Sequence, residues 1–154
     1  MLFNPRHENR FGGQEERLRR ADELTPDLMR EVIAETCTRF ATQGPAAQAK
    51  INRLIDAAAW TDATLALVEL ELPQWKLRRV VYEDGEWLCS LSKEPRLPLG
   101  LDHVAEASHE ILPLAILIAL IEARRAAAAS KIEVTIVPQV RVAESYAMCC
   151  DNFS

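Results

Sequence analysis

Residues 75–92 read WKLRRVVYEDGEWLCSLS, and this stretch decides the fold. Asp84 and Gly85 separate two runs rich in β-branched and aromatic residues. This dipeptide favours the tight turn of a β-hairpin, because both positions tolerate positive φ angles. A turn centred there predicts three cross-strand pairs: Tyr82 with Trp87, Val80 with Cys89, and Arg78 with Leu91. The apolar face of the hairpin must pack on other elements, since a lone hairpin is marginally stable in water.

Helical patterns surround the hairpin. Apolar spacing and capping signals predict helices near 26–43, 45–59, 61–72 and 110–129. Segment 61–72 is ambiguous: the alternation from Val68 to Leu72 favours a strand that would extend the hairpin to three strands. Thr61-Asp62 and the Ala, Leu and Glu content favour the helix that we prefer. We therefore predict an α+β domain, with an antiparallel hairpin layered with three to four helices.

Two shorter segments carry less regular patterns. Asp102 to His109 is predicted to form one or two helical turns. Lys131 to Val137 alternates between polar and apolar residues, which is typical of a strand, and Pro138 closes it.

The chain has 154 residues, a formal net charge of −5 and 27% charged residues, typical of one globular domain. We expect an N-terminal arm at 1–24 that is disordered or weakly helical, one domain at 25–142 and a flexible tail at 143–154. No basic stripe is present, so no nucleic-acid partner is predicted. The longest apolar run, 111–121, is shorter than the roughly 20 residues that span a bilayer, and no secretory signal precedes it. We expect no membrane partner and a cytoplasmic protein.

Only one group of residues resembles a set of metal ligands. His103, Glu106, His109 and Glu110 lie close in sequence, and on a helix His103, Glu106 and Glu110 share a face. A metal site needs three or four ligands with supporting partners, and no His-Glu-x-x-His motif is present. We predict no metal and no other cofactor.

The cysteines and serines carry no catalytic signature. Cys149 and Cys150 are adjacent in the tail and are predicted to be accessible, reactive thiols, whereas Cys37 and Cys89 fall on apolar faces. No Gly-x-Ser-x-Gly motif surrounds a serine, and no site combines a nucleophile, a base and an oxyanion donor. An enzyme is therefore not the expected class. We predict a non-enzymatic protein-interaction or self-association module, with a small-molecule or metal-binding regulatory protein as the alternative.

The segment 112–121 bears on self-association, because it is apolar on every side of the predicted helix. The hairpin covers one side of this helix and the helix at 26–43 another. Ile118 and Ile121 then lie either under segment 61–72 or against a second copy of the chain. We expect a homodimer with these two residues as interaction residues.

Four short motifs between Trp60 and Arg125 resemble those of a family of uncharacterised bacterial proteins. They are Trp-Thr-Asp-Ala at 60–63, Glu-Leu-Pro-Gln-Trp-Lys-Leu-Arg-Arg at 71–79, Asp-Gly-Glu-Trp at 84–87 and Leu-Pro-Leu-Ala-Ile-Leu at 112–117. The layout is also similar to the phage ABA sandwich domain. That resemblance implies α/β/α layering and no functional residues.

Overall fold

The computed structural model of the chain describes residues 5–98 and 100–136, with the side chains of 11–98 and 100–129. The fold is α+β, as predicted. In chain order the elements are α1 (Pro5–Arg20), α2 (Pro26–Thr36), α3 (Thr38–Thr42), α4 (Pro45–Asp56), α5 (Trp60–Glu71), β1 (Lys76–Glu83), β2 (Glu86–Ser92), β3 (Val104–His109) and α6 (Leu112–Ile136). None of the described helices is long and apolar enough to cross a membrane.

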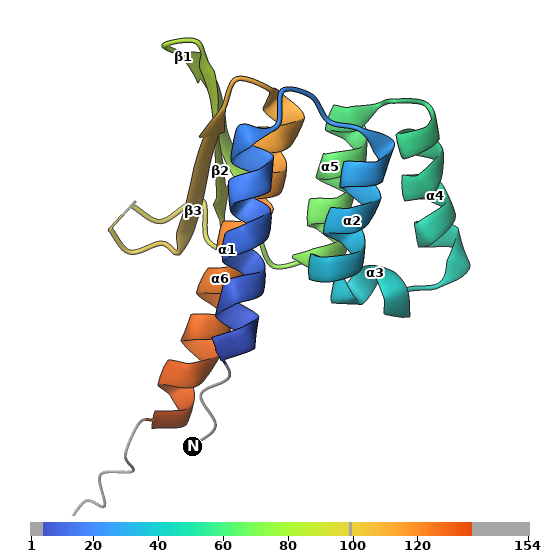
Figure 1. Cartoon of the computed structure of the whole chain (residues 1–154). Coiled ribbons are helices and arrows are strands. Elements are labelled where there is room, and N and C mark those ends of the chain that lie inside the picture. Colours follow the sequence, from blue (N-terminus) through green and yellow to red (C-terminus); the bar gives the residue numbers. More distant parts are fainter. Residues whose placement is uncertain (1–4, 99, 137–154) are drawn as a thin grey trace, which may run out of the picture.

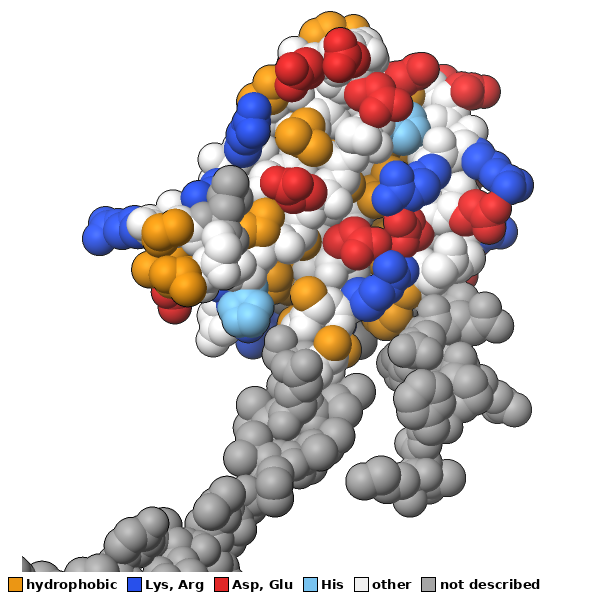
Figure 2. All heavy atoms as spheres, turned by 90° about the vertical axis from the view of Figure 1, so that its left-hand side faces the viewer, with side chains coloured by type: hydrophobic (Ala, Val, Ile, Leu, Met, Phe, Trp, Pro, Cys, Tyr) orange, Lys and Arg blue, Asp and Glu red, His pale blue; other side chains and the backbone are white. Residues whose placement is uncertain are grey.

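The elements form layers, and the sheet is the outermost layer on one side of the molecule (Figure 1). Helix α6 packs against β2 and β3, α1 lies alongside α6, and α2 to α5 lie on the far side of α6 from the sheet. No described helix covers the other face of the sheet, which faces the viewer in Figure 2. The α/β/α layering implied by the resemblance to the phage ABA sandwich domain is therefore wrong.

The hairpin forms at the predicted turn. Asp84 and Gly85 have φ angles of 54° and 86°, and Tyr82 pairs with Trp87 and Val80 with Cys89. The predicted pair of Arg78 with Leu91 is wrong. A β-bulge inserts one extra residue between Leu77 and Arg79, so that Leu77 lies opposite Leu91.

A third strand comes from a segment predicted to be helical. β3 pairs antiparallel with β2 and occupies most of 102–109, while segment 61–72 is the helix α5. Ala105 and Ala107 alternate with exposed Glu106, and their small side chains are buried against α6. Close packing of α6 on this strand outweighs the low strand propensity of alanine.

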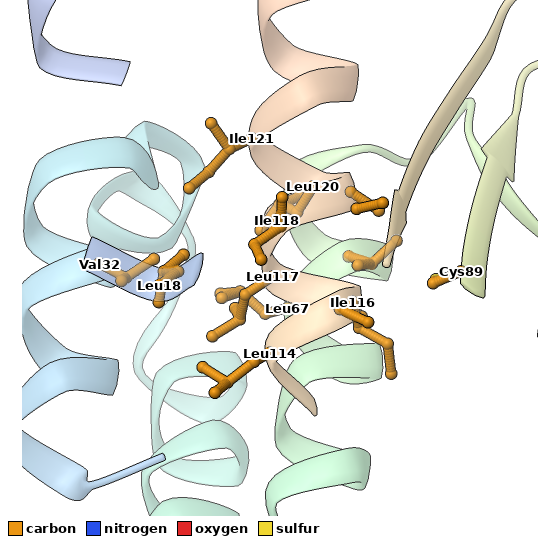
Figure 3. Close-up of a cluster of buried hydrophobic side chains, with 14 of the residues drawn as sticks. Leu18, Val32, Leu67, Cys89, Leu114, Ile116, Leu117, Ile118, Leu120 and Ile121 are labelled. Atoms are coloured by element: carbon orange, nitrogen blue, oxygen red, sulfur yellow. The ribbon is translucent and has the colours of Figure 1, made fainter. Parts of the chain in front are cut away.

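Helix α6 is the centre of the core, and its residues 114–121 are all buried. Figure 3 shows that Ile116 points toward the strand that carries Cys89, whereas Leu114, Leu117 and Ile121 point toward the other helices. The helix continues to Ile136, so the predicted strand at 131–137 is wrong as far as the described residues reach. The sequence before this segment favours continuation of the helix, because Ala126 to Ala129 are strong helix formers.

Two further differences concern helix α1 and the break between α2 and α3. The expected N-terminal arm contains α1, which includes the pair Gly12-Gly13 and is held by packing, with Leu18 fully buried. The predicted helix at 26–43 breaks at Cys37 into α2 and α3. The carboxylate of buried Glu71 accepts hydrogen bonds from the backbone N–H groups of Arg39 (3.3 Å) and Phe40 (2.6 Å) and so caps α3. Arg124 of α6 donates to the same carboxylate at 2.5 Å.

Candidate interaction surface

The free edge of β1 is the most exposed part of the sheet. Within the described residues β1 pairs only with β2, on one side, and none of its residues is buried. Two large hydrophobic side chains on its helix-facing side remain exposed, Leu77 at 42% and Tyr82 at 58%. A sheet edge presents unpaired backbone N–H and C=O groups, so this strand offers both apolar contact and hydrogen bonds.

The bulge divides β1 into two parts. Residues 79–83 keep a regular register with β2 up to the turn, whereas the part before Arg79 is interrupted by Arg78. In the regular part, the Tyr82 and Trp87 rings are 5.0 Å apart at an interplanar angle of 52°. The regular part ends at the acidic turn end of the hairpin (Figure 2, top).

A braced loop stands beside the bulge. Asp102, whose side chain is fully buried, accepts hydrogen bonds from Arg78 at 2.6 Å, from the backbone N–H of Glu94 at 2.9 Å and from Ser92. Arg78 also donates to the carbonyl of Leu97. Burial alone would raise the pKa of Asp102, but these hydrogen bonds together outweigh it and lower the pKa. The two described parts of this loop, 93–98 and 100–103, are thus held together beside the bulge, and Leu101 is 72% exposed.

A polar hollow of about 270 Å³ lies between the end of α1 and the sheet. Its arginines are already paired: Arg19 donates to Glu15, and Arg20 to Glu16. His109, at its edge, accepts a hydrogen bond on Nδ1 from the backbone N–H of Ile111 at 2.9 Å. Known ligand pockets are mostly apolar with a few convergent polar groups, and this hollow has the opposite character.

The metal-ligand candidates do not converge. His103 precedes β3 and is exposed, Glu106 lies on the outer face of β3, and His109 is buried on the helix-facing side. A strand sends alternate side chains to opposite faces, so the helical spacing that would join His103 and Glu106 does not exist. The described residues contain no group of three or more potential metal ligands.

The other predicted site residues divide into two groups. Ile118 and Ile121 are fully buried within one chain, so the expectation that they meet a partner is wrong. The helix α5 and its neighbours fill the space that we assigned to a second copy, because segment 61–72 is helical. Cys149 and Cys150 lie outside the described residues, as does the tail 143–154. Burial raises the pKa of Cys37 to about 12 and that of Cys89 to about 11.

Comparisons with protein-family models, with curated proteins and with solved structures gave no match. The candidate surface therefore rests on the geometry of the chain itself. Sequence reasoning missed the bulge and Asp102, whose partners Ser92 and Arg78 lie 10 and 24 residues away. The one available signal was a lone aspartate that closes a loop rich in proline.

Proposed function

We propose that the protein is a non-enzymatic interaction module, acting in the cytoplasm, that binds a protein chain along the free edge of β1. Addition of a strand to a sheet edge is a common mode of recognition, in which backbone hydrogen bonds give affinity and side-chain contacts give specificity. One observation supports the proposal: β1 has both an open edge and two exposed hydrophobic side chains, Leu77 and Tyr82.

The contrast with β2 strengthens this choice. The last four residues of β2 are buried, and α6 packs on β2 and β3. The exposed apolar side chains of β1 therefore add little to the core, and binding of a partner gives them a role. The outer face of the sheet is a weaker candidate, because antiparallel sheets commonly leave one face in water.

The test removes a backbone hydrogen-bond donor from the edge of β1 and compares this change with the loss of side-chain atoms alone. Val80→Pro removes a backbone N–H from β1, and Val80→Ala is the matched control that removes side-chain atoms only. Full-length wild type and both variants, each checked by urea unfolding, are immobilised and exposed to an extract of the natural host. We expect a defined set of bound proteins, or a second copy of the chain, that Val80→Ala retains and Val80→Pro loses. Equal binding by two folded variants would contradict the proposal.

A further inference from the structure

We infer that the partner is a second copy of this chain, whose β1 pairs antiparallel with β1 of the first and joins the two three-stranded sheets. This inference rests on the proposed function, since it names the occupant of the same edge. Two copies related by a two-fold axis must present a surface that is complementary to itself. The regular part of β1, residues 79–83, has that property.

Hydrogen-bond alternation fixes which backbone groups are available. In a hairpin with a two-residue turn, the pair that flanks the turn, here Glu83 with Glu86, is hydrogen-bonded, and the next pairs alternate. Val80 and Tyr82 therefore direct their N–H and C=O groups away from β2. A two-fold axis at Val81 places Val80 of one copy opposite Tyr82 of the other, and both residues have outward backbone groups. The same axis avoids the bulge, which interrupts the strand only before Arg79.

The side chains match in this register. Arg79 and Glu83 lie on the outer face, are exposed, and have no ion-pair partner among the described residues. Each Arg79 then stands opposite Glu83 of the other copy, which gives two ion pairs. On the helix-facing side, Val80 of one copy contacts Tyr82 of the other, next to the half-buried ring of Trp87. Charge and apolar character are thus both complementary across the axis.

The position of the hairpin leaves room for this contact. Figure 1 shows the turn end of the hairpin at the periphery of the molecule, away from the helices on the far side of α6. A strand pairing of about five residues buries much less surface than the roughly 800 Å² per partner of a standard interface. The dimer is therefore weak, and its population depends on concentration. The charge pairs are exposed, so salt weakens the dimer further.

Disulfide trapping tests the register directly. In a background with Cys149→Ser and Cys150→Ser, Val81→Cys places two thiols opposite each other on the axis, at a Cβ separation of roughly 4.5–5.5 Å. The controls are Val80→Cys, which is displaced from the axis, and Val104→Cys on the other edge strand. Under mild oxidation we expect a disulfide-linked dimer of Val81→Cys at least tenfold faster than of either control. Equal rates for the three variants, or faster linking of Val80→Cys, would overturn the inference.

A charge exchange provides a second measurement that introduces no thiol. Arg79→Glu and Glu83→Arg each place like charges across the axis, and we expect each to weaken the dimer about fivefold or more in sedimentation equilibrium. The double variant restores opposite charges and should recover most of the wild-type association. Loss in the double variant as well, or no change in the single variants, would contradict the inference. If self-association is absent but Val80→Pro still abolishes capture of a host protein, the proposed function stands without self-pairing; if capture is also unaffected, both fail.

Discussion

The two edge strands of the sheet differ in how the rest of the molecule uses them. On β3, the helix-facing residues Ala105, Ala107 and His109 are buried, and α6 packs against the strand. On β1, the corresponding residues Leu77 and Tyr82 are exposed and Val80 is half-buried. The core therefore depends on β3, whereas β1 is held chiefly by its pairing with β2 and by the contact of Arg78 with Asp102. Burial separates a strand that stabilises the fold from one that is available for recognition.

The largest effect is expected from a charge placed under α6. Ala107→Glu forces a carboxylate into the contact between β3 and α6, and we expect a loss of about 4 kcal/mol in the free energy of unfolding. The matched change on the other edge, Val80→Glu, leaves its carboxylate near water and should cost less than about 1.5 kcal/mol. Urea unfolding of both variants measures the difference. Equal losses would mean that the two edges contribute alike to the core.

A smaller effect is expected at the aromatic pair near the turn. The hairpin pattern alone suggests that Trp87→Ala costs about 3–5 kcal/mol, the usual range for a buried aromatic residue. The structure leaves Trp87 half-buried beside an exposed Tyr82, so we expect about 2 kcal/mol. Tyr82→Ala should cost less than Trp87→Ala. A loss above about 4 kcal/mol for Trp87→Ala would show that the turn end of the hairpin belongs to the core.

The brace at the bulge predicts a pH dependence. Hydrogen bonds hold the folded-state pKa of Asp102 below its unfolded value, so its contribution to stability is present above the unfolded pKa, near 4. That contribution is lost as the pH falls through the folded pKa. We expect the stability difference between wild type and Asp102→Asn to be constant near neutral pH and to shrink in acid below about pH 4. A difference that grows in acid would contradict the assigned direction.

The last prediction compares the thiol reactivity of the buried cysteines with that of the tail cysteines. At pH 8, the raised pKa values of Cys89 and Cys37, about 11 and about 12, leave each at least about a hundredfold less thiolate than an ordinary cysteine. Native protein should therefore show two fast thiols, Cys149 and Cys150, and two that react only after unfolding in urea. Deletion of 143–154 should remove the fast class and leave folding intact. The prediction would be contradicted if Cys149 and Cys150 in the native protein reacted as slowly as Cys37.

The parts of the fold that could be predicted from the sequence are those with local signals. Asp84-Gly85 defined the turn and two of the three cross-strand pairs, and the apolar run at 112–121 identified the central helix. The strand β3 was missed because alanine, serine and glutamate have low strand propensity, and only packing under α6 selects the extended form.

Features set by distant partners gave no local signal. Arg78 enters the bulge because its guanidinium reaches Asp102, and α2 ends at Cys37 because a carboxylate from α5 caps α3. Helix α1 contains two glycines, and its contact with α6, including the pair of Glu15 with Arg125 at 2.9 Å, outweighs their poor helix propensity. The free edge of β1 followed from the strand order, which no single segment determines.

The burial of residues 114–121 of α6 has a consequence for hydrogen exchange. Among the described elements, α6 lies between the sheet and the outer helices, so neither side can detach without exposing residues 114–121 to water. The amides of this helical segment therefore exchange only when the whole molecule opens, and they report the global free energy of unfolding. The amides at the free edge of β1 exchange through small local fluctuations, so a single exchange map separates the cooperative unit from the strand that remains available for pairing.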